Sequence, residues 1–121
     1  MRVLVIDDSR AMRRILSSIL TGLGHEVVEA CDGQDGLNQV EKSGPFSLAL
    51  VDWNMPNLNG YEFVCKIRAD DKHSAMKVMM VTTEVETAQV TRALEAGANE
   101  YVMKPFTQDV IREKIEMLQA A

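Results

Sequence analysis

Short apolar runs alternate with longer amphipathic stretches along the whole chain. Five of these runs, rich in β-branched residues, predict strands at residues 3–6, 26–30, 48–51, 78–81 and 100–103. The first, third and fourth runs are continuously apolar, which is typical of inner strands of a parallel sheet covered on both faces. The second and fifth runs carry glutamate, which favours positions nearer the sheet edges.

The stretches between these runs have helical periodicity. In the first of them, Ser9 is a candidate cap, and an apolar stripe runs through Met12, Ile15, Leu16, Ile19, Leu20 and Leu23. Further helices are predicted at residues 33–42, 60–68, 86–96 and 108–119, the last with Thr107 as cap. Five strand–helix units in alternation predict an α/β fold, a parallel sheet sandwiched between helices on both faces.

Composition and charge narrow the functional classes. The 121 residues suit one globular domain, and a net charge of −5 disfavours nucleic acid or an anionic membrane as partner. Arg13 and Arg14 are expected on a solvated helix face. Cys31 and Cys65 match neither a disulfide framework nor a metal-site spacing, so both are expected as small buried residues of a cytoplasmic protein.

Candidate chemistry lies where the predicted strands end, which is where open α/β sheets bind ligands. The first strand is followed by Asp7 and Asp8, the third by Asp52, the fourth by Thr82 and the fifth by Lys104. These side chains form one site only if the four strands are neighbours. Each residue alone has an ordinary reading as a turn, cap or surface charge, so the prediction depends on their convergence.

The chemistry of that set favours magnesium and phosphoryl transfer. Three close carboxylates repel one another, and a hard divalent cation such as Mg²⁺ removes that cost. A carboxylate beside Mg²⁺ can attack a phosphoryl group without a general base, because it is already ionised at neutral pH. The Lys104 ammonium and the Thr82 hydroxyl could then hold two phosphoryl oxygens.

At these residues the chain resembles the receiver domains of bacterial two-component response regulators. The motifs that carry the likeness are Val5-Ile6-Asp7-Asp8-Ser9, Val51-Asp52-Trp53-Asn54-Met55-Pro56, Asn59-Gly60, Val81-Thr82, Gly97-Ala98 and Lys104-Pro105-Phe106. Met12-Arg13-Arg14 and Thr107 add a closer similarity to single-domain chemotaxis regulators. The resemblance implies one receiver domain over residues 1–121, with the flavodoxin-like (βα)5 fold and its strand order 2-1-3-4-5.

The resemblance also implies a role for each residue at the strand ends. Asp52 would be the phosphoacceptor and a ligand of Mg²⁺. Asp8 would bind the ion directly, Asp7 mostly through water, and Asn54 through its backbone carbonyl. Lys104 would pair with a phosphoryl oxygen.

Four further expectations come from the same likeness. Thr82 would bond the phosphoryl group, and Tyr101 would turn inward as a switch when Thr82 moves. Asn54 and Glu84 would tune the lifetime of the phosphorylated state. The peptide between Lys104 and Pro105 would be cis, which an X-Pro bond allows at small cost.

The implied function is a signalling switch, not an enzyme with an external substrate, although it would catalyse its own phosphorylation and dephosphorylation. A histidine kinase would supply the phosphoryl group, and the flagellar motor switch would read it. The readout face would lie on the fourth helix, fifth strand and fifth helix. Its expected members are Val85, Val90, Leu94, Tyr101, Met103 and Lys114. We expect a monomer, because no helix carries a long second apolar stripe.

Four alternatives remain open at this point. The chain could be a phosphorelay shuttle between two histidine proteins, or a fragment of a larger transcription regulator. A magnesium-dependent phosphohydrolase usually has a second aspartate two residues after its nucleophile, where this chain has Asn54. A flavin carrier would need a phosphate loop after the first strand, where Asp7 and Asp8 would repel the phosphate.

Overall fold

Five strands and five α-helices alternate along the chain in a computed structural model that describes residues 1–83 and 87–120. The elements are β1 (Arg2–Ile6), α1 (Arg10–Gly22), β2 (Glu26–Ala30), α2 (Gly33–Ser43), β3 (Leu48–Asp52), α3 (Gly60–Arg68), the 3-10 helix η1 (Asp71–His73), β4 (Lys77–Thr82), α4 (Thr87–Ala96), β5 (Glu100–Met103) and α5 (Gln108–Ala120). Every predicted strand and helix is present. The expected start of α4 at residue 86 lies outside the described residues.

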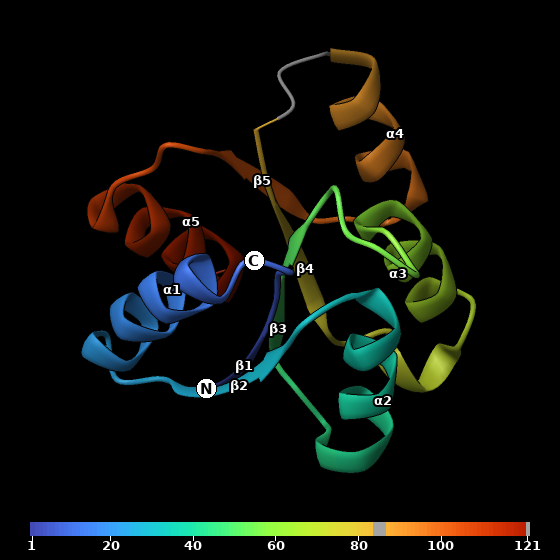
Figure 1. Ribbon diagram of the computed structural model, residues 1–121, viewed down its shortest axis with the longest axis horizontal. Coiled ribbons are helices and arrows are strands. Elements are labelled where there is room, and N and C mark those ends of the chain that lie inside the picture. The colour runs from blue at the N-terminus through green and yellow to red at the C-terminus, as the bar shows by residue number, and fades with distance from the viewer. Residues whose placement is uncertain (84–86, 121) are drawn as a thin grey trace.

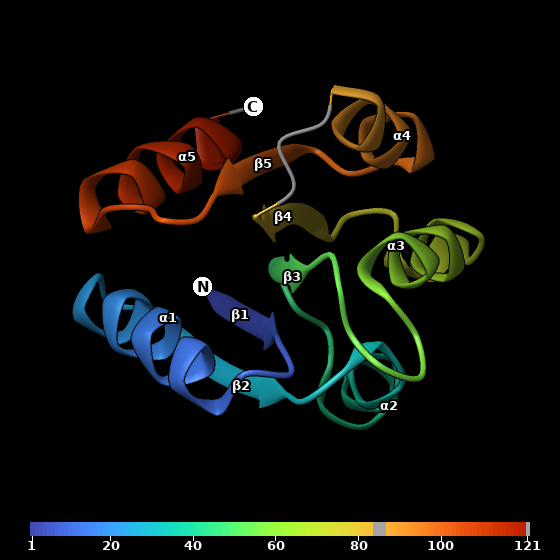
Figure 2. The same ribbon diagram turned by 45° about the horizontal axis from the view of Figure 1, so that its top comes forward.

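The strands form one parallel sheet in the order β2-β1-β3-β4-β5, which confirms the flavodoxin-like topology. Helices α1 and α5 cover one face of the sheet, and α2, α3 and α4 cover the other (Figure 1). Figure 2 shows the same three layers after rotation. The two glutamate-containing strands, β2 and β5, are at the edges as expected.

Side chains of the inner strands are buried on both faces of the sheet. On one face, Leu4, Ala49 and Met80 belong to a core cluster with Phe63 of α3. Their chain neighbours on the other face form a second cluster with side chains of α1 and α5. The two clusters explain why the sequence of β1, β3 and β4 is continuously apolar instead of alternating. Among the described residues, none of the helices could span a bilayer.

Several surface expectations need correction. Ile15 is 49% exposed, because it lies about 100° around α1 from the buried Leu16, at the margin of the stripe. Cys65 is exposed for the same geometric reason, next to buried Val64 on α3. Cys31 is exposed as well, since it follows an edge strand. Their exposure contradicts the expectation that both cysteines are buried.

Local signals at the element ends are confirmed. The Ser9 hydroxyl accepts a hydrogen bond from the Met12 amide at 3.2 Å, and the Thr107 hydroxyl accepts one from the Val110 amide at 3.2 Å. The peptide between Lys104 and Pro105 is cis, as is that between Gly44 and Pro45.

The start of α3 is pressed against the end of β3, and only glycine fits there. The Gly60 amide donates to the Trp53 carbonyl at 3.0 Å. A Cβ on Gly60 would lie 2.3 Å from the Asp52 carbonyl oxygen, which is backbone and cannot rotate away. The absence of a side chain at Gly60 therefore lets the backbone of Asp52 lie directly beneath α3.

We expect Gly60→Ala to lower the free energy of unfolding by about 1–3 kcal/mol, because the added methyl overpacks this contact. Gly22→Ala is the matched control, since a Cβ there meets nothing within 4 Å. That change should raise the free energy of unfolding by up to about 1 kcal/mol. Urea denaturation measures both, and equal stability of the parent and Gly60→Ala would contradict the close approach.

Candidate functional site

Three carboxylates gather at the carboxyl ends of the neighbouring strands β1 and β3. Asp7, Asp8 and Asp52 each offer an oxygen within 4.8 Å of the others. Asp7 is 1% exposed and Asp52 9%, whereas Asp8 is open to solvent. The register places them together, because β1 pairs with β3 up to Ile6 and Val51, so Asp7 and Asp52 follow at the same level.

Lys104 places its ammonium beside the two buried carboxylates, and it is the only positively charged side chain among the predicted site residues. Its Nζ lies 3.2 Å from Asp7 Oδ2 and 3.3 Å from Asp52 Oδ1. Lys104 enters the site from the end of β5, where its backbone amide donates to the Thr82 carbonyl at 2.9 Å. Lys104 is separated in the chain from Asp7 by 97 positions and from Asp52 by 52, yet the three side chains meet at one point.

One ammonium does not neutralise this cluster. The pKa of Asp52 is raised from its usual 3.8 to about 6, mainly by burial and also by the Asp7 charge, and Lys104 offsets only part of the effect. An added cation would lower this cost directly. The cluster offers oxygen ligands alone, partly solvated at Asp8, which matches the preference of Mg²⁺.

Thr82 and Tyr101 lie on β4 and β5, the strands that follow β1 and β3 in the sheet. Thr82 ends β4 and is buried, and Tyr101 on β5 is half-buried. Both line one small cavity together with Trp53 and with Gln89 of α4. The structure therefore places the predicted switch pair around a common space between the sheet and α4.

Asn54 and Glu84 are the remaining predicted site residues. Asn54 is exposed, two residues beyond Asp52. Glu84, like Val85 of the expected readout face, lies outside the described residues. Trp53, which directly follows Asp52, is buried, with its ring centroid 6.0 Å from that of Tyr61.

Sequence reasoning missed Arg13. It was expected on a solvated face, yet its side chain is only 16% exposed and its Nη1 donates to the Asp7 carbonyl at 2.6 Å. The available signal was its position, one helical turn after the capping Ser9, which directs a long side chain back toward the end of β1.

A second acidic group is a weaker candidate. Glu41, Asp70 and His73 also have ligand atoms within 4.8 Å of one another. Lys72 already supplies a cation there, 3.3 Å from Glu41 and 3.7 Å from Asp70, and most of these side chains are solvated. This arrangement is an ordinary surface ion-pair cluster.

Comparisons with known proteins agree with this geometry. The chemotaxis protein CheY homolog of Campylobacter jejuni subsp. jejuni is 47% identical over 96% of this chain and 90% of the relative. The structure of Vibrio cholerae chemotaxis protein CheY4 is 30% identical, covers 97% of both chains and superposes with a TM-score of 0.91.

One neighbour carries the ion that the carboxylate cluster favours. The receiver domain of sensor histidine kinase PA1611 from Pseudomonas aeruginosa PAO1, which has a magnesium ion coordinated in its active-site cleft, is 22% identical, covers 99% of this chain and 98% of its own, and has a TM-score of 0.90. At that identity it supports the fold alone. The profile of the response regulator receiver domain matches residues 3–116. The chain therefore belongs to the response regulator receiver domain family.

Proposed function

We propose that the chain is a phosphorylation-controlled switch in which Asp52 accepts a phosphoryl group from a histidine kinase. Receiver domains of this type serve phosphorylation-dependent signalling between a kinase and a downstream target. The observation that carries the proposal is the position of Lys104, whose Nζ lies within 3.3 Å of both Asp7 and Asp52. An ammonium that contacts two buried carboxylates is also close enough to pair with the negative oxygens that Asp52 would gain on phosphorylation.

Asp7, Asp8, Asp52 and the backbone carbonyl of Asn54 would hold Mg²⁺. When bound, the ion supplies positive charge to the carboxylates and to the oxygens of the incoming phosphoryl group. The fit is supported by the raised pKa of Asp52, because burial and the neighbouring Asp7 charge are the costs that a divalent cation relieves.

The transfer itself needs no added base. An oxygen of ionised Asp52 attacks phosphorus, the bond from phosphorus to the donor histidine nitrogen breaks, and its electron pair stays on the imidazole. Lys104 would pair with one phosphoryl oxygen, and the Thr82 hydroxyl would donate to another. The chain acts here on its own residue, and Asn54 and Glu84 would tune hydrolysis of the product.

The signal would reach the surface through Thr82 and Tyr101, which share a cavity beneath α4. Movement of Thr82 toward the phosphoryl group would leave space for the Tyr101 ring to turn inward. Leu94 of α4 and Met103 of β5 are each 43% exposed, so apolar contact area is available on this face. Phosphorylation would bias two arrangements of this face and so change its affinity for a target.

The target we propose is the flagellar motor switch, and the active chain is proposed to be a monomer. Support comes from relatives that are chemotaxis proteins and align along nearly the whole chain. A phosphorelay shuttle has the same fold and site, so it is an alternative outcome of the binding test below.

Acetyl phosphate with Mg²⁺ should add one phosphoryl group to the parent chain, detected by intact mass spectrometry. The Asp52→Asn variant keeps the size of the side chain but lacks the nucleophile, so it should gain none. Omission of Mg²⁺ should also prevent the gain in the parent. Equal gain in parent and variant would show that another residue is the acceptor.

The site also predicts a pH dependence of stability in metal-free buffer. Because the pKa of Asp52 is about 6 when folded and 3.8 ordinarily, the folded chain binds this proton more tightly. Below pH 4 the group is protonated in the folded and the unfolded chain, so it costs no stability. The cost of ionising it in the folded chain grows between pH 4 and 6 and is complete above that range. Allowing for solvent screening, the cost is about 1–2 kcal/mol.

Urea unfolding of the parent and of Asp52→Asn across this range is the measurement. The parent should lose stability relative to the variant as pH rises from 4 to 7, and Mg²⁺ should remove most of that difference at pH 7. Parallel profiles without metal would contradict the raised pKa.

Binding to a motor-switch peptide tests the output. Phosphorylation should strengthen it by about 5–150-fold, the usual range of coupling between sites. Leu94→Asp should abolish most of that gain, whereas Ile15→Asp, at a similarly exposed site on α1, should retain it. Transfer to a histidine phosphotransfer domain without peptide binding would favour the phosphorelay alternative.

A further inference from the structure

All four polar atoms of Asp7 have partners where β1 ends. Its amide donates to the Ala30 carbonyl at 3.1 Å, Oδ1 accepts from the Ser9 amide at 2.8 Å, and Oδ2 accepts from Lys104. Its carbonyl accepts from Arg13 Nη1 at 2.6 Å. Two of these partners are backbone groups and a third, Lys104, is a predicted site residue, so Arg13 is the one partner whose side chain has no predicted role at the site.

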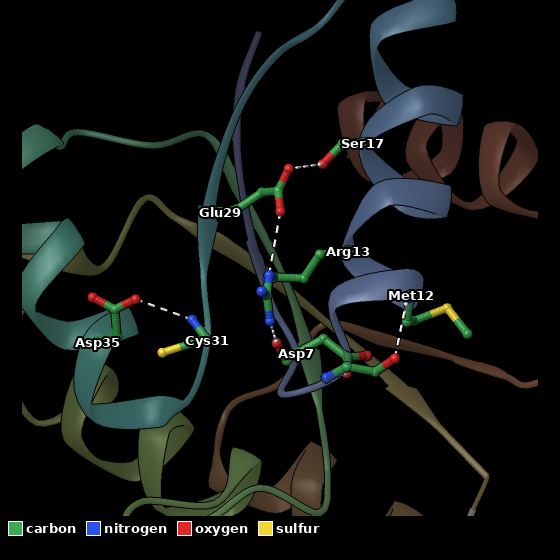
Figure 3. A network of polar contacts seen from close by, with 8 residues as sticks. Asp7, Met12, Arg13, Ser17, Glu29, Cys31 and Asp35 are labelled. Atoms are coloured by element: carbon green, nitrogen blue, oxygen red, sulfur yellow. Dashed lines mark hydrogen bonds and ion pairs between the residues drawn. The ribbon is translucent and has the colours of Figure 1, made fainter.

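The guanidinium of Arg13 is itself held in place. Its Nε lies 3.3 Å from Glu29 Oε1 on β2, and the Ser17 hydroxyl donates to Glu29 Oε2 at 3.0 Å. Figure 3 shows this chain of contacts, in which Arg13 reaches from α1 between Glu29 and the backbone of Asp7. Arg13 contacts the backbone of Asp7 at one end of the network and Glu29 of β2 at the other. Each contact can therefore be removed separately by substitution.

The Asp7 carbonyl needs such a donor because the sheet no longer supplies one. The pairing of β1 with β2 and with β3 ends at Ile6. A buried carbonyl without a partner is costly, and a charged donor forms the stronger type of hydrogen bond. This carbonyl belongs to the planar peptide that joins Asp7 to Asp8, so its direction fixes the backbone from which both carboxylates project.

We propose that Arg13 is a positioning residue for the magnesium site, acting through the peptide between Asp7 and Asp8; this role rests on the function proposed above. Glu29 and Ser17 orient the guanidinium and do not reach the carboxylates. Charge alone predicts the opposite effect, since removing a positive group near the cluster would strengthen binding of a cation. The sign of the change therefore separates positioning from simple electrostatics.

The test is a Mg²⁺ titration followed by the fluorescence of Trp53, the single tryptophan of the chain. Arg13→Met keeps much of the side-chain bulk but removes the donor and should weaken Mg²⁺ affinity by about 10-fold, as loss of outer contacts to metal sites does. Glu29→Gln is the matched control, because it cuts the same network and leaves the contact from Arg13 to Asp7. Its loss of affinity should be clearly smaller.

Urea unfolding without Mg²⁺, run on the same variants, separates site geometry from general stability. Weaker Mg²⁺ binding by folded Arg13→Met, at a stability similar to that of Glu29→Gln, supports the role. If Arg13→Met does not fold, Arg13→Lys replaces it, and weaker binding than in Glu29→Gln is again required.

Two outcomes overturn the inference. Affinity equal to or tighter than the parent's in the folded arginine variant overturns the role of Arg13 alone. A parent that shows no response to Mg²⁺ overturns both this role and the proposed metal site.

Discussion

The central constraint in this structure is the repulsion between two buried carboxylates at the ends of neighbouring inner strands. Asp7 and Asp52 share one ammonium, that of Lys104, and burial still holds the pKa of Asp52 near 6. Such an arrangement costs stability in the resting protein. Contacts of the surrounding backbone fix the points from which these side chains project.

These contacts lie on two sides of the carboxylate cluster. On one side, the carbonyl of Asp52 lies beneath the start of α3, where Gly60 permits the approach. On the other, the amide and carbonyl of Asp7 are bonded to Ala30 and Arg13. Parallel strands that end at one level then carry both carboxylates to the same edge of the sheet.

The fold could be predicted from sequence because each inner strand is apolar on both faces and each helix has a readable stripe. The strand order came from the family resemblance, since alternation alone does not rank the strands. Ile15 and Cys65 were misjudged because residue type alone does not show which flank of a helix is covered. Arg13 was missed because its partner is a backbone carbonyl, and no residue type marks a carbonyl that has lost its strand partner.

The same backbone links the site to the face that would carry the signal. Phosphorylation of Asp52 would exchange one carboxylate charge for about −1.5 to −2. Lys104, held between Asp7 and Asp52, would then have to redistribute its contacts. Its own amide is bonded to the Thr82 carbonyl at 2.9 Å, so the new charge would act on β4 and β5 together. Because Thr82 and Tyr101 border one cavity, a shift of either changes the room left for the other. Under the proposed function, a charge change at the sheet edge would thereby become a packing change beneath α4.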